Sequence, residues 1–467
     1  MTGSLKRYSL LRKRASSEYI AEGYGEMTKV ITYGTFDLLH RGHIRLLERA
    51  KELGDYLIVG ITSDSFDRFR GKINVNQTLI ERVEAVRNLG IADKIIVEEY
   101  EGQKIDDIRR YDIDIFTVGS DWIGYFDYLN EYCKVVYLER TDGVSSTSIR
   151  SDMKKLTMGI VGDDQYLHKF YRESKYVNGL MIESALTRNA DADAFEGIRF
   201  AKDYDELLDS VDSVYIYEYP QLHYSMIKEA LLRKKHVLCE APITLDVDQY
   251  LELCEIARQN DCLLMDGLRT AFSTAYERLC LMLKSGMIGD IKMIDVTCTS
   301  LREYKEGTSD KWNSICSWGP TAMLPIFQLF GTEHVGKNMI CKLSEDDPDY
   351  DVMTKIDFVY KNAVATVKVG QGIKSEGELI ISGTKGYAYV PAPWWKTEYF
   401  EIRYEDQSLN KRFYYQLEGE GIRNELVAFR DKVVNRNDHR GIEPDVSREF
   451  ISVIRDFYDK KDVTLIE

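Results

Sequence analysis

Short apolar runs alternate with segments of helical spacing through the first third of the chain. Residues 29–35 (KVITYGT) and 56–62 (YLIVGIT) are apolar enough to form buried strands. Between them, apolar side chains recur every three or four positions, which predicts a helix over 43–53. Strands that alternate with helices indicate a parallel α/β sheet. The other elements predicted in this part are a helix over 79–89 and strands over 95–97, 115–118 and 135–138.

The same alternation restarts after about residue 150 and predicts a second doubly wound unit. After about residue 290 it gives way to short strands separated by turn signals, a pattern typical of a largely antiparallel sheet. The predicted fold class is therefore two parallel Rossmann-like α/β domains followed by an α+β domain. The elements that carry this prediction are strands over 157–161, 177–182, 213–217, 236–239, 262–265, 294–299, 354–358, 363–369, 378–382 and 388–391, and helices over 224–232, 247–258, 422–434 and 446–458.

Composition narrows the class of protein. The 467 residues carry a net charge of −15, which argues against a nucleic-acid binder. The eight cysteines are scattered singly, so we expect reduced thiols rather than disulfides or a zinc site. No apolar run reaches the ~18 residues of a membrane span, and the basic first segment lacks the apolar core of a signal peptide. We expect a cytoplasmic homodimer or larger homo-oligomer, divided into an arm over 1–26 and domains over 27–153, 154–275 and 276–467.

The segment GTFDLLHRGH at 34–43 follows the first predicted strand and opens the first predicted helix. Backbone N–H groups and the helix dipole favour an anion at such a position. His40 and His43 share one face of a helical turn, and Gly42 between them lets a phosphate approach the backbone. Two imidazole donors there would neutralise charge on a transferring phosphoryl group. The pattern favours a nucleotide-phosphate site over two unrelated surface histidines.

Three motifs in order resemble the cytidylyltransferase branch of the HxGH nucleotidyltransferases, most closely the glycerol-3-phosphate cytidylyltransferases. They are VITYGTFDLLHRGHIRLLERAKELGDYLIVGITSDSF from residue 30, DIFTVGSDW at 114–122 and VVYLERTDGVSSTSIR at 135–150. The resemblance implies transfer of CMP from CTP to a small alcohol phosphate such as glycerol 3-phosphate, giving a CDP-alcohol and pyrophosphate. We expect Mg²⁺ to enter with the CTP and to need few ligands from the protein.

The resemblance also assigns roles to individual positions. The two histidines contact the CTP phosphates, a lysine of a mobile loop closes on them, and an arginine of the second helix lies on the phosphate side. A second arginine of the family falls on Gly90, so either Arg87 replaces it or the acceptor is not glycerol 3-phosphate. The loop around the lysine also holds fewer lysines than the family has. The implied catalytic residues are His40, His43, Lys72 and Arg140, and the implied binding residues are Gly34, Thr35, Phe36, Asp37, Gly42, Arg82, Gly119, Asp121, Trp122, Thr141, Ser145, Ser146 and Thr147.

Residues 157–400 resemble the Gfo/Idh/MocA oxidoreductases, a nicotinamide-dependent family, through GIVG at 159–162, VLCEAPITLD at 237–246 and ISGTKGYAYV at 381–390. A dinucleotide fingerprint needs three glycines. Gly162 keeps the first, whereas Asp164 and Leu167 stand at the other two. The carboxylates of Asp163 and Asp164 would also repel a pyrophosphate. NAD(P) binding is therefore the less favoured alternative for this region.

The acid/base positions of this second family are changed as well. Ala241 stands where the family has a lysine and has no proton to give. Thr321 and Ser317 stand at the positions of a His or Tyr and an Asp, and His223 is expected to pack or cap a helix start. These losses favour an inactive scaffold. The alternatives are an NAD(P)H-dependent reductase of a keto-sugar, a triose phosphate or its CDP derivative, a small-molecule sensor, and a module that binds a transferase of cell-surface polymer synthesis.

Overall fold

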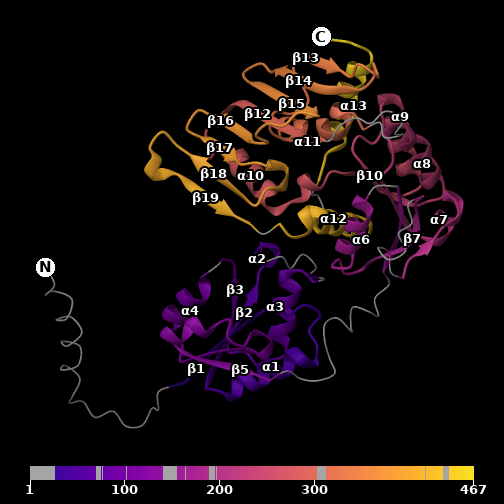
Figure 1. Cartoon of the computed structure of the whole chain (residues 1–467). Coiled ribbons are helices and arrows are strands. Elements are labelled where there is room, and N and C mark those ends of the chain that lie inside the picture. The colour runs from indigo at the N-terminus through magenta and orange to yellow at the C-terminus, as the bar shows by residue number, and fades with distance from the viewer. Residues whose placement is uncertain are drawn as a thin grey trace, which may run out of the picture. The chain divides into compact units, whose positions relative to one another are not determined.

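A computed structural model describes residues 27–69, 75, 77–100, 102–139, 155–162, 165–188, 195, 197–301, 312–415, 417–434 and 441–467. The described residues form two compact units, 27–66 with 75–139 and 155–467 (Figure 1). Within these ranges no helix combines the length and the apolar character that crossing a bilayer requires.

The first unit is a five-stranded parallel sheet in the order β3-β2-β1-β4-β5 (Figure 1). From β1 the chain continues to β2 and β3 on one side of the sheet, and β4 and β5 lie on the other side. The switch point therefore lies between the carboxyl ends of β1 and β4. The bounds are β1 Lys29–Gly34, α1 Arg41–Glu52, β2 Tyr56–Thr62, α2 Asp64–Phe69, α3 Leu79–Asn88, β3 Lys94–Glu98, α4 Gln103–Tyr111, β4 Ile115–Gly119 and β5 Lys134–Leu138, with short 3₁₀ helices at Ser120–Trp122 and Asp127–Glu131.

The central strands of this sheet are buried on both faces. Along β1, Ile31 and Tyr33 belong to one hydrophobic cluster and Val30 to another, as the two-residue period of a strand requires. The α3 helix starts with a capping box, in which the Thr78 hydroxyl accepts from the Glu81 N–H and the Glu81 carboxylate accepts from the Thr78 N–H. The covered sheet therefore holds the loops at its carboxyl edge on a rigid base.

The second unit begins with a six-stranded parallel sheet in the order β11-β10-β9-β6-β7-β8, whose switch point lies between β6 and β9. The strand predicted over 177–182 instead starts at Leu180, because α6 ends at Ser174 and a turn through Gly179 follows (φ 77°). The bounds are β6 Leu156–Val161, α6 Tyr166–Ser174, β7 Leu180–Leu186, β8 Arg199–Phe200, α7 Tyr204–Ser210, β9 Ser213–Ile216, α8 Pro220–Leu232, β10 His236–Glu240, α9 Val247–Gln259 and β11 Leu264–Gly267.

A nine-stranded mixed sheet completes the second unit, and α11 packs on it (Figure 1). Its β12–β15 and β13–β20 pairs are parallel and its other neighbouring strands are antiparallel. One hydrophobic core runs through both sheets of this unit. The predicted fold class is confirmed. The bounds are α10 Thr274–Lys284, β12 Ile291–Ser300, α11 Ser314–Phe330, β13 Gly336–Leu343, β14 Asp351–Val359, β15 Val364–Gln371, β16 Leu379–Gly383, β17 Tyr387–Val390, β18 Tyr399–Arg403, β19 Lys411–Tyr414, α12 Ile422–Val434, α13 Pro444–Tyr458 and β20 Val463–Leu465.

Candidate functional site

The two histidines of the first unit meet at the amino end of α1. His40 is the N-cap of this helix, and its Nδ1 accepts the N–H of Gly42 at 3.0 Å. The rings of His40 and His43 stack with their centroids 3.9 Å apart and their planes 21° apart. Because Nδ1 of His40 is the acceptor, the proton of its neutral ring lies on Nε2. The helix start therefore offers imidazole N–H donors next to its own backbone N–H groups.

The loop between β1 and α1 is held in an unusual backbone conformation. Phe36 and Leu38 have φ values of 53° and 47°, which cost non-glycine residues about 1–3 kcal/mol each. Gln77 fixes this loop, since its side-chain carbonyl accepts the Leu38 N–H at 2.8 Å and its own N–H binds the Asp37 carboxylate at 3.0 Å. A Cβ on Gly34 would come within 3.0 Å of the Phe36 ring. Glycine at that position therefore makes room for the ring.

Arg82 on α3 is fully buried and joins three segments of this unit. Its guanidinium donates to the carbonyls of Thr35 at 2.6 Å, Thr62 at 2.9 Å and Gln77 at 3.2 Å, and it pairs with Asp64. Sequence resemblance placed this arginine beside the phosphates. Its bond to Thr35 holds the loop that carries the histidines, and its bonds to Thr62 and Gln77 hold the end of β2 and the segment before α3. The contact of this arginine with the phosphates stays a prediction.

The other predicted binding residues of this unit follow β4. Because β1 and β4 are neighbours, Gly119, Asp121 and Trp122 lie at the same edge of the sheet as Gly34 and the histidine loop. A Cβ on Gly119 would meet no atom of the described residues within 4 Å, so these residues leave space beside the end of β4. Six predicted site residues lie outside the described ranges: Lys72, Arg140, Thr141, Ser145, Ser146 and Thr147.

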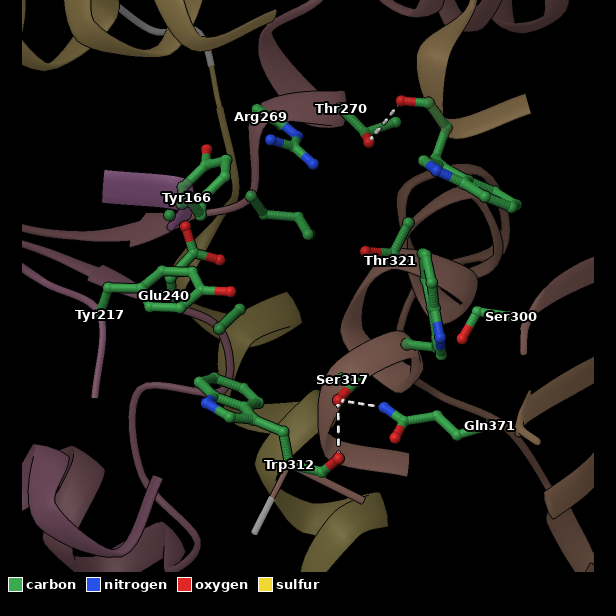
Figure 2. Close-up of a pocket in the computed structure, with 15 residues that line it drawn as sticks. Tyr166, Tyr217, Glu240, Arg269, Thr270, Ser300, Trp312, Ser317, Thr321 and Gln371 are labelled. Carbon is green, nitrogen blue, oxygen red and sulfur yellow. Dashed lines mark hydrogen bonds between the residues drawn. The ribbon is translucent and has the colours of Figure 1, made fainter. Parts of the chain in front are cut away.

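The second unit holds a cavity of about 260 Å³ beside the carboxyl ends of β10 and β11 (Figure 2). Three positions that sequence comparison singled out as altered acid/base positions, Ala241, Ser317 and Thr321, all line it. The Ser317 hydroxyl is already engaged, because it donates to the Trp312 carbonyl and accepts from the Gln371 amide. Among these three, only Thr321 therefore presents to the cavity a hydroxyl that has no hydrogen bond to a described residue.

Gly162 and Leu167, at two positions of the dinucleotide fingerprint, pack closely at the carboxyl end of β6. A Cβ on Gly162 would lie 2.1 Å from the Tyr217 carbonyl oxygen and 3.3 Å from Leu167 Cδ1. Only glycine fits at position 162, because the Tyr217 carbonyl lies so close to it. Leu167 is a buried core residue. The ring of Tyr166 lies 5.1 Å from that of Tyr217 at the same end of the sheet. Asp163 and Asp164 lie outside the described residues.

His223 is a structural residue at the start of α8. It is fully buried, and its two ring nitrogens lie 2.9 Å from the Pro242 carbonyl oxygen and 2.8 Å from that of Glu218. Burial lowers the pKa of its imidazole to about 4. The expectation that this histidine packs or caps is confirmed.

Several residues of this cavity were not predicted from the sequence. They are Tyr166, Tyr217, Glu240, Arg269, Trp312, Trp318 and Trp395. Arg269 and Glu240 could have been predicted from the sequence. Each lies at or just after the carboxyl end of a buried parallel strand, where ligands of doubly wound sheets bind. The eight cysteines are all free, and among the described residues no group of three His, Cys, Asp or Glu side chains could hold a metal ion.

The first unit has the features of a nucleotidyltransferase: a parallel sheet, an open switch point, and paired histidines at a helix start. Residues 31–152 match the family described as cytidylyltransferase-like, and residues 158–268 match the oxidoreductase family with an NAD-binding Rossmann fold. The chain belongs to the cytidylyltransferase-like family, and it carries the oxidoreductase-family domain behind that part.

Known relatives agree with this assignment. The glycerol-3-phosphate cytidylyltransferase of Bacillus spizizenii is 51% identical over 130 residues, which are 28% of this chain and all of that protein. The Staphylococcus aureus enzyme of the same name is 45% identical over 127 residues, 27% of this chain and 96% of that protein. The 3-ketoreductase KijD10 of Actinomadura kijaniata, solved with NADP and TDP-benzene, covers 67% of this chain and all of its own, with a TM-score of 0.58 and 19% identity. At that identity the likeness shows the fold.

Proposed function

We propose that this chain transfers CMP from CTP to a small alcohol phosphate such as glycerol 3-phosphate, and that its second unit does not act as a nicotinamide-dependent oxidoreductase. The observation that carries the first part is the stacked pair His40 and His43 at the open amino end of α1. The two named relatives, both glycerol-3-phosphate cytidylyltransferases, support the acceptor class.

In this reaction an oxygen of the acceptor phosphate attacks the α-phosphorus of CTP. A new P–O bond forms, the bond to the β-phosphate breaks, and pyrophosphate leaves. Positioning and charge neutralisation carry such a transfer. The His40 Nε2–H and the His43 ring act as donors to phosphate oxygens, and the α1 N-terminus adds its backbone N–H groups and dipole.

Mg²⁺ fits this proposal as a companion of the triphosphate, whose charge it would neutralise. The described residues contain no cluster of ligands for it. Since the protein offers no such cluster in this part of the chain, no step is assigned to a metal held by side chains. Magnesium usually keeps several waters and binds through substrate phosphates at sites of this kind.

The nucleotide and the acceptor are tested together by pyrophosphate release. The full chain is incubated with CTP, ATP or GTP, each with glycerol 3-phosphate or ribitol 5-phosphate. We expect CTP to be turned over fastest with at least one acceptor. Equal or faster turnover with ATP would contradict the cytidylyl assignment, and no release with any pair would contradict the transferase.

The second part of the proposal rests on the residues at the carboxyl end of β6 and in the neighbouring cavity. Gly162 packs against the Tyr217 carbonyl, Leu167 occupies the adjoining space, and Ala241 lines the cavity where the resemblance places a lysine. These residues do not fit a dinucleotide pyrophosphate, so no hydride transfer is derived for this unit.

Titration with NADPH and NADH tests this part, with nucleotide fluorescence as the readout. We expect no saturable binding at micromolar concentrations. Micromolar binding of either, or reduction of a ketose phosphate or its CDP derivative, would favour a bifunctional enzyme with a working reductase.

A further inference from the structure

The cavity of the second unit has lost the acid/base lysine position yet remains lined by polar and aromatic side chains. Its volume of about 260 Å³ lies below the about 300–1,000 Å³ of sites that hold drug-sized ligands, so it suits a small metabolite. Figure 2 shows Arg269, Glu240, Tyr217 and Thr321 arranged around one empty centre.

Arg269 places a buried guanidinium at one corner of this cavity, where the carboxylates of Glu240 and Glu425 also interact with it. Its Nη1 is buried and makes no hydrogen bond to any residue that the structure describes. Its guanidinium carbon lies 4.9 Å from the centroid of the Tyr166 ring. Figure 2 shows the guanidinium directed toward the cavity. Buried donors are usually paired, and a guanidinium edge matches two oxygens of a phosphate or carboxylate.

A carboxylate, that of Glu240, lies in the same cavity. Glu240 ends β10, lines the cavity and accepts the Tyr215 hydroxyl at 2.5 Å. An ionised carboxylate only accepts hydrogen bonds, so it suits ligand hydroxyls rather than a second anion. The Thr321 and Tyr217 hydroxyls point toward the same centre in Figure 2. A ligand with several hydroxyl groups could bond to these groups together.

Tryptophans form the remaining walls. Trp312, Trp318 and Trp395 line the cavity, and the rings of the last two lie 4.8 Å apart. Large flat side chains of this kind pack well against the C–H surface of a small carbon chain while offering an N–H donor at one edge. The walls therefore suit a short polyhydroxylated carbon chain better than a bulky apolar ligand.

We propose that this cavity binds a polyol monophosphate of about three to six carbons without a dinucleotide, with the phosphate on Arg269 and the hydroxyls on Glu240 and Thr321. The inference goes beyond the proposed transferase function and does not rest on it. It assigns the second unit a ligand of its own, held by charge and hydroxyl recognition, with no bond made or broken.

Tryptophan fluorescence offers a direct test. Three of the five tryptophans of the chain line this cavity, whereas Trp122 lies in the first unit and is removed as Trp122→Phe in the protein used for titration. The probes are ribitol 5-phosphate and glycerol 3-phosphate, with ribitol and inorganic phosphate as controls. We expect saturable quenching by at least one phosphorylated polyol. Ribitol should bind at least about tenfold more weakly, as loss of a charged hydrogen bond predicts, and inorganic phosphate should also bind more weakly because it lacks the hydroxylated carbon chain.

Arg269→Met should weaken binding of the effective probe at least about tenfold, and Arg269→Lys should weaken it less. The matched control is Arg258→Met, which removes an arginine whose side chain is 74% exposed on α9, and it should bind like the parent protein. No quenching by either probe, equal affinity for ribitol, or unchanged affinity in Arg269→Met would each overturn the proposal. Should Arg269→Met fail to fold, the comparison of ribitol with ribitol 5-phosphate decides. Pyrophosphate release by the wild-type chain reports on the transferase separately, so the two proposals fail independently.

Discussion

Replacing Arg82 by methionine separates two roles for this arginine, phosphate contact and loop anchor. Methionine keeps much of the buried volume and removes every donor. The three bonds from the guanidinium to the carbonyls of Thr35, Thr62 and Gln77 are 2.6–3.2 Å long. A hydrogen bond to a charged group contributes at least about 1.5 kcal/mol. The Asp64 side chain is 37% exposed, so its ion pair adds at most about 1 kcal/mol.

These contributions predict that Arg82→Met lowers the stability of the first unit by about 4–5 kcal/mol, a large part of the total for a domain. Hydrogen exchange of the buried β1 and β2 amides in the full chain reports on this unit alone. We expect exchange about a thousandfold faster than in the wild type, because each 1.4 kcal/mol is a factor of ten. The kcat of CMP transfer should fall too, since Arg82 holds the loop that carries the histidines.

Arg87→Met is the matched control, because Arg87 is an exposed arginine on the same helix. It should exchange like the wild type. If Arg82→Met also exchanged within tenfold of the wild type and changed only the KM for CTP, Arg82 would be a phosphate contact. The anchoring role drawn from its buried bonds would then be refuted.

Three further changes test other parts of the molecule. His43→Ala and His40→Ala should each lower the kcat of CMP transfer by a factor on the order of 10² or more, and near wild-type rates in both would exclude their role. Arg140→Ala should raise the KM for CTP by about 10–100-fold with the fold intact by circular dichroism, whereas an unfolded variant would make this arginine structural. Burial raises the pKa of the Asp266 carboxyl from 3.8 to about 6, so its stabilising contribution is present below about pH 4 and is lost as the pH rises through 6. Asp266→Asn should therefore gain up to about 3 kcal/mol over the wild type between pH 4 and 7 in urea unfolding, and a pH-independent difference would contradict this.

The parallel sheets were predictable from the sequence because their buried strands are nearly continuous apolar runs. The β2 strand occupies the predicted residues, and α12 has the predicted bounds. The helix α11 was harder to predict from the sequence. Pro320 and Pro325 lie inside this helix, and proline is normally a signal that ends one. The β19 strand, Lys411–Tyr414, carries mostly exposed side chains at the edge of its sheet and therefore lacks an apolar pattern.

The proximity of His40 and His43 was predictable, because it follows from their spacing of three residues along the chain. The candidate site was not predictable where contacts join distant segments. The anchoring bonds of Arg82 reach residues up to 47 positions away, and the pairing of Gln77 with the loop spans about 40. The Nη1 of Arg269, which has no hydrogen bond within the described residues, is recognised only when β11, α6 and α11 are brought around one cavity.

The buried position of Leu167 limits which substitutions this protein can accept there. It stands at a glycine position of the dinucleotide fingerprint, and it is buried in the core that both sheets of the second unit share. Exchanging it for glycine would leave a void that costs about 2–5 kcal/mol, and glycine inside a helix adds about 1 kcal/mol. The Tyr217 carbonyl would still approach Gly162 as closely as before. A variant that regained glycine at this position would thus lose much of its stability, so restoring the complete fingerprint by a single substitution meets a barrier in this fold.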